Sequence, residues 1–100
     1  MPNTSVLVPG DKRTKEFLSR AHGYVQVAKD AGLPFNDQLQ EAVDFMEIHS
    51  QGSSPLSFRV LQASFNRHCG REAQRWINCF KRELVYCTTL PANCTPGDHS

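Results

Sequence analysis

Apolar residues recur three or four positions apart in four stretches of this chain, the spacing that places side chains on one face of an α-helix. Residues that end helices separate these stretches, namely Gly32, the cluster 49–55 (HSQGSSP), Gly70 and Pro91. Helices joined by such short connections favour antiparallel neighbours. The 100 residues can bury a core without metal or disulfide support. The sequence therefore predicts an all-α fold, a small single-domain bundle of about four short amphipathic helices with extended N- and C-terminal arms.

The first two helices have clear start and stop signals. Asp11 or Thr14 is predicted to cap the first helix, because either side chain can accept a hydrogen bond from a free backbone N–H group. Gly32 is predicted to end that helix in the left-handed conformation. Asn36 is predicted to cap the second helix.

The start of the third helix is ambiguous. The Ser54-Pro55 pair suits the start of a third helix, but residues 56–60 (LSFRV) also alternate with a period of two, as in a short strand. The fourth helix is expected over residues 71–88, and the apolar residues 6–8 are expected to dock on the bundle or on another copy of the chain. The expected divisions are an N-terminal arm (1–11), a helical domain (12–90) and a C-terminal tail (91–100).

Charge is segregated along the chain, although the formal total is only +1. All five charged residues between positions 30 and 58 are acidic. Residues 59–82, in contrast, carry six Lys or Arg residues and a single acidic one. The fold can pair these blocks internally or display them on different faces, and only display would steer a charged partner.

Cysteines are spread through the second half of the chain. Cys69, Cys79, Cys87 and Cys94 are separated by nine, seven and six residues. Zinc ligands usually come in pairs two to four residues apart, so neither a metal site nor a cofactor is predicted. Cys69 and Cys87 are expected to be small buried side chains, and Cys87 with Cys94 is the pair best spaced for a disulfide.

A catalytic role would centre on Cys69. The flanking Arg67 and Arg71, together with the positive start of the next helix, favour a thiolate at Cys69, whereas the negative end of the preceding helix opposes it. A thiol-dependent sensor or enzyme is therefore the third interpretation. The chain contains no glycine-rich phosphate loop, no His-Glu-x-x-His motif and no nucleophile-elbow serine motif, so it is predicted not to be an enzyme.

The expected fourth helix carries a polar stripe opposite its apolar face, where Trp76 is expected to lie in the core. Arginine binds phosphates and guanine edges, and asparagine pairs with adenine. One interpretation is therefore a DNA-binding transcriptional regulator with helix 71–88 as the recognition helix, assisted by Arg67. The isoelectric point of 7.7 argues against it, because nucleic-acid-binding domains usually exceed about 9. The stripe, spaced i, i+4, i+7 and i+11, consists of Arg71, Arg75, Asn78 and Arg82.

The second helix carries an acidic counterpart made of Asp37, Glu41 and Asp44. Arginine and aromatic side chains are enriched in protein interfaces, where exposed members of Tyr24, Trp76 and Tyr86 would serve as anchors. The favoured interpretation is a small regulatory or inhibitory module that binds a protein partner through charged helix faces, and a homodimer is compatible with it. No apolar run approaches the roughly 20 residues of a membrane span, and no signal-peptide pattern is present, so an intracellular location, cytoplasmic or nuclear, without membrane association is expected.

Overall fold

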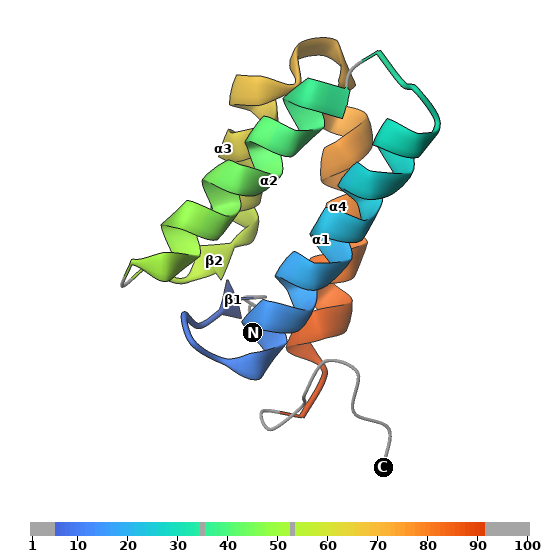
Figure 1. Cartoon of the computed structure of the whole chain (residues 1–100). Coiled ribbons are helices and arrows are strands. Elements are labelled where there is room, and N and C mark those ends of the chain that lie inside the picture. Colours follow the sequence, from blue (N-terminus) through green and yellow to red (C-terminus); the bar gives the residue numbers. More distant parts are fainter. Residues whose placement is uncertain (1–5, 35, 53, 92–100) are drawn as a thin grey trace.

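Within residues 6–34, 36–52 and 54–91, which the structure describes, the computed structural model contains four α-helices that run up, down, up and down (Figure 1). Each helix packs against the next in sequence, and α1 also packs against α4 to close the ring. The predicted all-α bundle with antiparallel neighbours is confirmed. The elements are β1 (Val6–Leu7), α1 (Lys12–Asp30), α2 (Asn36–Gln51), β2 (Leu56–Ser57), α3 (Phe58–His68), the 3-10 turn η1 (Gly70–Glu72) and α4 (Ala73–Thr88).

This ring order separates α2 from α4. Both helices contact α1 and α3, and they occupy opposite corners of the bundle. They also run in the same direction, from the top to the bottom of the view in Figure 1. The outer faces of α2 and α4 therefore point away from each other.

Helix α1 begins and ends at residues that the sequence predicts. The Asp11 carboxylate caps the helix by accepting a hydrogen bond from the backbone N–H of Arg13 at 2.9 Å. At the other end Gly32 adopts a φ of 68°, which lets the Leu33 N–H reach back to the Ala28 carbonyl oxygen at 3.1 Å. Helix α2 begins at Asn36 itself, so the residue predicted to cap this helix is its first helical residue.

Helix α3 starts later than the Ser54-Pro55 pair suggests, and that prediction is wrong. Ser57 is the cap instead, accepting a hydrogen bond from the Val60 N–H at 3.4 Å. The preceding Leu56 is held extended because it pairs with Leu7 in an antiparallel ladder, and both side chains are buried. The alternative of a short strand is thus correct for Leu56–Ser57, and the N-terminal segment around Leu7 docks on its own bundle.

The fourth helix is shorter than expected at its start. Gly70 has a φ of 50° and opens the 3-10 turn, so that Arg71 precedes the α-helix, which begins at Ala73. A 3-10 turn is a common entry to an α-helix. The expected recognition helix 71–88 is therefore a turn followed by α4.

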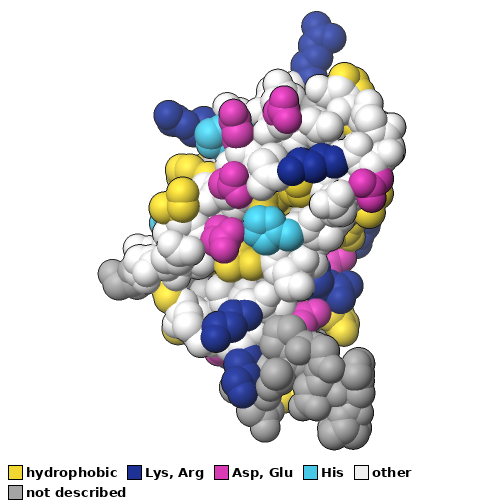
Figure 2. Space-filling model, viewed as in Figure 1, with side chains coloured by type: hydrophobic (Ala, Val, Ile, Leu, Met, Phe, Trp, Pro, Cys, Tyr) yellow, Lys and Arg dark blue, Asp and Glu magenta, His cyan; other side chains and the backbone are white. Residues whose placement is uncertain are grey.

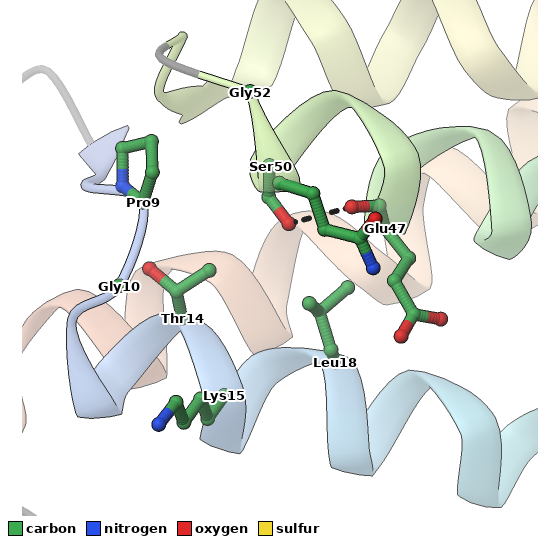
Figure 3. Close-up of a pocket in the computed structure, with 9 residues that line it drawn as sticks. Pro9, Gly10, Thr14, Lys15, Leu18, Glu47, Ser50 and Gly52 are labelled. Atoms are coloured by element: carbon green, nitrogen blue, oxygen red, sulfur yellow. Dashed lines mark hydrogen bonds between the residues drawn. The ribbon is translucent and has the colours of Figure 1, made fainter.

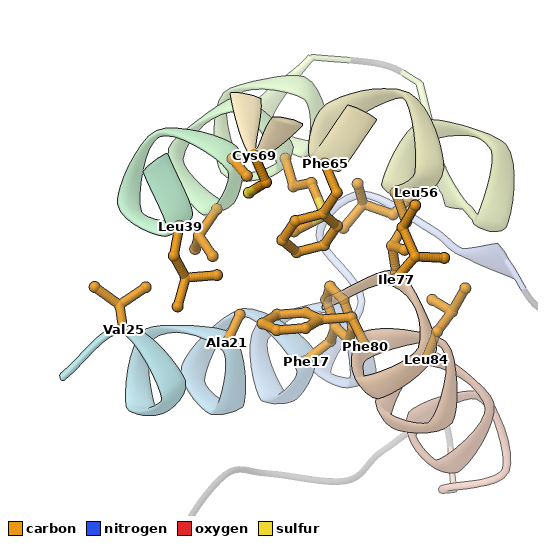
Figure 4. Packing of buried hydrophobic residues seen from close by; sticks show 14 of the residues in the cluster. Phe17, Ala21, Val25, Leu39, Leu56, Phe65, Cys69, Ile77, Phe80 and Leu84 are labelled. Atoms are coloured by element: carbon orange, nitrogen blue, oxygen red, sulfur yellow. The ribbon is translucent and has the colours of Figure 1, made fainter. Parts of the chain in front are cut away.

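The core is built on phenylalanines from three helices (Figure 4). Phe80 of α4 lies 4.8 Å from Phe65 of α3 and 6.2 Å from Phe17 of α1, measured between ring centroids. Cys69 and Cys87 are buried among apolar neighbours, as predicted. The other buried apolar side chains of the cluster are Leu7, Ala21, Val25, Ala28, Leu39, Ala42, Val43, Met46, Leu56, Leu61, Ala73, Ile77 and Leu84.

Candidate functional site

The polar stripe predicted on the fourth helix lies on the outer side of the bundle. Ala73, Ile77 and Phe80 point into the core, and at about 100° per residue the side chains of Arg75 and Arg82 must point outward. We call this surface the basic face. Its members, all exposed, are Arg71, Arg75, Asn78 and Arg82.

Local contacts hold part of the basic face without neutralising it. Arg75 forms an exposed ion pair with Glu72 at 3.4 Å, and its guanidinium lies 5.9 Å from the centre of the Trp76 ring. Asn78 accepts a hydrogen bond from Gln74 at 2.9 Å. Surface pairs of this kind contribute little, on the order of 0–1 kcal/mol, and exchange readily for a partner's groups.

Arg67 does not belong to the basic face. It lies in α3, nine residues after Phe58, and nine residues at about 100° each place two side chains on opposite sides of a helix. Phe58 faces α4, since the Lys81 ammonium lies 5.2 Å from the centre of its ring. Arg67, which is exposed, therefore points away from α4.

The acidic residues predicted to share a face lie along the outer side of α2. We call Asp37, Glu41 and Asp44 the acidic face, and Figure 2 shows acidic side chains gathered over α2. Glu41 lies 3.6 Å from the Nδ1 atom of His68 in α3. The carboxylate of the half-buried Asp44 accepts a hydrogen bond from Gln40 at 2.9 Å.

The two charged faces do not neutralise each other. The acidic face is on α2 and the basic face is on η1 and α4, at opposite corners of the ring. The ion pairs that involve these faces are formed with nearby residues: Arg75 pairs with Glu72, three positions earlier, and Glu41 pairs with His68 of the adjacent α3. The charge segregation of the sequence is thus displayed on two sides of the fold.

Apolar side chains adjoin both charged faces at their C-terminal ends. On α2, Ile48 is 68% exposed and Phe45 is 37% exposed, while on α4 Val85 and Tyr86 are about as exposed as Phe45. Sequence reasoning identified Tyr86 and missed the other three. The sequence could have revealed these three residues by their position, because each is an apolar side chain on the polar side of an amphipathic helix.

A polar cluster that the sequence did not reveal joins α1 to α4. Glu83 accepts hydrogen bonds from the Arg20 guanidinium at 2.5 Å and from the Tyr24 hydroxyl at 2.8 Å. The bond to Glu83 raises the pKa of Tyr24 well above its usual range, and burial acts in the same direction. The cluster borders an open cleft of about 320 Å³, and its polar groups are hydrogen-bonded to one another.

Cys69 has an environment that keeps it protonated. Its side chain is buried, and the thiol lies 3.7 Å from the Gln38 carbonyl oxygen. Burial, followed by the nearby carboxylates of Glu72 and Glu41, raises the pKa of the thiol to about 11. A thiolate is therefore disfavoured at neutral pH, and of the opposing effects that the sequence suggested, the favourable one from Arg67 and Arg71 does not prevail.

The aromatic anchors expected for an interface differ in exposure. Tyr86 is 48% exposed and lies 4.8 Å from the Arg20 guanidinium, measured to the ring centre. Tyr24 is half-buried against Phe80. Trp76 is also half-buried rather than fully buried, and it meets Phe80 edge to face at 6.2 Å.

A larger cleft, of about 510 Å³, lies between the start of α1 and the end of α2 (Figure 3). Its hydroxyl groups are already engaged, since Thr14 donates to the Val8 carbonyl oxygen and Ser50 donates to the Glu47 carbonyl oxygen. Lys15 and Glu47 line opposite walls. The Glu47 carboxylate is also engaged, since it lies 2.8 Å from the Nε2 atom of His22. Both hydroxyls and this carboxylate are thus already bonded within the protein, whereas Lys15 is exposed.

The described part of the chain contains no group of three or more His, Cys, Asp or Glu side chains placed to hold a metal ion. Cys94, the expected disulfide partner of Cys87, lies outside the described residues. Among the helices described, none is long and apolar enough to cross a membrane. Comparisons with protein-family models, with curated proteins and with solved structures found no match to this chain.

Proposed function

We propose that this protein is a small regulatory or inhibitory module that acts by binding a protein partner through the acidic face of α2 and the basic face of η1 and α4. The observation that carries the proposal is the placement of these two faces on opposite corners of the bundle, where neither neutralises the other. Exposed charge of this kind steers association and selects partners.

Exposed apolar side chains beside each face add to this argument. Ile48 adjoins the acidic face, and Tyr86 adjoins the basic face. Protein interfaces combine a few apolar or aromatic anchors with a charged rim, and arginine and tyrosine are enriched among their strongest contacts. The two surfaces have this composition.

A DNA-binding regulator with α4 as the recognition helix is the second candidate, favoured by the outward position of Arg71, Arg75 and Arg82. The arrangement of α3 and α4 supports it less. The two helices run antiparallel, whereas the helices of a helix-turn-helix motif cross at about 90–120°. We therefore rank it below protein binding.

The test is capture of partners from an extract of the cells that express the protein, with nuclease added. The tagged full chain is compared with a basic-face variant, Arg75→Glu/Arg82→Glu, and an acidic-face variant, Asp37→Lys/Asp44→Lys. The variants should keep the fold, because three of the altered side chains are exposed and the half-buried Asp44 bonds to Gln40 of its own helix. The loss of Asp37 from the first turn of α2 costs only about 0.3–1 kcal/mol.

A matched control, Lys15→Glu/Arg59→Glu, reverses two charges outside both faces. Both of its positions are exposed in the early turns of helices, where a negative charge is tolerated. We expect at least one protein to be captured by the wild type and the control and lost with one or both face variants. Equal recovery of every captured protein with all four chains would refute the proposal.

A further inference from the structure

We infer that the partner of these faces includes a second copy of this chain: the acidic face of one molecule binds the basic face of the next, in a head-to-tail array. The inference rests on the proposed function, because it assigns a partner to the same two surfaces.

The charged residues of the two faces are spaced alike. Asp37 and Asp44 are seven residues apart on α2, and Arg75 and Arg82 are seven residues apart on α4. Seven residues are nearly two helical turns, about 10.5 Å along the axis, so each pair lies on one side of its helix. Two helices laid side by side can therefore join Asp37 to Arg75 and Asp44 to Arg82 at the same time.

The apolar residues fix the relative direction of the two helices. Ile48 follows Asp44 by four residues, and Tyr86 follows Arg82 by four residues. When α2 and α4 of two molecules lie parallel, both charge pairs form and Ile48 meets Tyr86. In the antiparallel arrangement Ile48 would lie beside the arginine end of α4, where its apolar surface gains no cover. The parallel arrangement is thus the complementary one.

The direction of α2 and α4 within one molecule determines the kind of assembly. The two helices already run the same way in the bundle, so a parallel contact between copies keeps all copies in the same orientation. Their faces point to opposite sides, and each bound pair leaves one acidic and one basic face unoccupied. Such a heterologous contact propagates as an open array unless a rotation between copies closes a ring.

Both faces are accessible for this contact. Ile48 and Tyr86 are 68% and 48% exposed, and Asp37 and Arg82 are exposed and form no ion pair with another residue of the described part of the chain. The contact of Asp44 with Gln40 lies within one helix and can persist or exchange.

The experiment is sedimentation of the purified full chain over a wide range of protein concentration, in about 0.05 M salt and in 1 M salt, where the screening length falls to about 3 Å. At low salt the weight-average mass is expected to rise with concentration to at least about twice that of the monomer, by mass action. In 1 M salt the rise should largely disappear.

Charge exchange makes the test specific. The basic-face variant Arg75→Glu/Arg82→Glu and the acidic-face variant Asp37→Lys/Asp44→Lys should each stay monomeric alone, because one contact surface of each has the wrong sign. An equimolar mixture of the two should associate again, because every acidic face then meets a basic one. The control Lys15→Glu/Arg59→Glu should behave as the wild type, and Ile48→Gln should weaken association by about tenfold without changing any charge.

A wild-type chain that remains monomeric at low salt overturns the inference, as does association that persists unchanged in both face variants. Failure of the mixture to recover association also overturns it. The proposed function is judged separately by capture from extract, so a monomeric chain whose face variants lose a captured protein would refute self-association and leave that function standing.

Discussion

Tyr24 of α1 donates a hydrogen bond of 2.8 Å to Glu83 of α4, and this bond joins two residues that are 59 positions apart in the chain. The other carboxylate oxygen of Glu83 accepts a hydrogen bond from Arg20. The carboxylate is mostly shielded from solvent, with 14% of the side chain exposed. A charged group is thus part of the seam that closes the helical ring.

The first prediction concerns the pH dependence of stability. Burial by itself would raise the pKa of Glu83, but the hydrogen bonds from Arg20 and Tyr24 outweigh it and lower the pKa below its ordinary value of 4.5. A carboxyl whose pKa is lower in the folded state stabilises the fold above its unfolded pKa, and this contribution is lost as the pH falls through the folded value. Glu83→Gln should therefore lower the free energy of unfolding by about 1–2 kcal/mol at pH 7.

Urea unfolding of the wild type and Glu83→Gln at pH 7 and at about pH 3 checks this prediction. The difference between the two proteins should shrink markedly at the lower pH. Glu47→Gln is the control, because the bond of Glu47 to His22 lies among side chains that are 40% exposed, where such pairs contribute about 0–1 kcal/mol. An equal difference at both pH values would contradict the assignment.

The second prediction compares two glycines of the first helical hairpin. Gly32 has a φ of 68°, so Gly32→Ala should destabilise the protein by about 1 kcal/mol even though no atom would clash with the new Cβ. Gly23 lies inside α1 with open space around it, so Gly23→Ala should stabilise the helix by about 0.5–1 kcal/mol. Opposite shifts of the thermal midpoint are expected, and shifts of the same sign would contradict this account.

Much of the bundle follows from patterns that extend over several helical turns. The apolar spacing of α1 and α2 predicts their buried faces because each pattern repeats many times, and Asp11 and Gly32 mark the ends of α1 by local chemistry. The polar stripe on α4 was predicted for the same reason. Arg71 was expected inside the fourth α-helix but lies in the 3-10 turn before it. A 3-10 entry to a helix has no distinctive spacing in the sequence, so this start could not be predicted.

The remaining features depend on residues far apart in the chain. The alternation of residues 56–60 suggested a short strand, but nothing in the local sequence indicates that Leu56 pairs with Leu7, 49 positions earlier in the chain. The bonds of Glu83 with Arg20 and Tyr24 arise from the packing of α1 on α4. The display of the two charged faces on opposite corners is likewise a property of the ring order, which the sequence left open between internal pairing and display.

The third prediction concerns the N-terminal segment. Leu7 is completely buried and belongs to the core cluster, so Leu7→Ala should lower the free energy of unfolding by about 2–5 kcal/mol. Its neighbour Val8 is 52% exposed, and Val8→Ala should change stability by less than about 0.5 kcal/mol. Chemical unfolding of both variants measures the difference. Equal effects would mean that the segment is not part of the core.

The fourth prediction concerns thiol reactivity. Because Cys69 is buried and its pKa is raised to about 11, its alkylation by iodoacetamide at pH 7.5 should be slow in the folded protein. Cys79, which is only half-buried, should react faster than Cys69 and Cys87. Mass spectrometry of digested protein after timed alkylation distinguishes the sites, and denaturant should equalise their rates. Preferential labelling of Cys69 in the folded chain would revive the thiol-dependent interpretation.

The last prediction separates protein binding from DNA binding at the basic face. Three arginines along η1 and α4 can neutralise only a few phosphates, and the salt dependence of binding scales as about 0.9 per phosphate contacted. If the face serves a protein partner, fluorescence anisotropy with generic duplex DNA at about 50 mM salt should give no saturation up to about 10 μM protein. Binding at micromolar concentration that weakens steeply by about 200 mM salt, and that Arg75→Glu/Arg82→Glu abolishes while Lys15→Glu/Arg59→Glu does not, would instead make α4 a nucleic-acid-binding helix. The comparison of the two variants is decisive because both reverse two positive charges, so only the position of the charge differs between them.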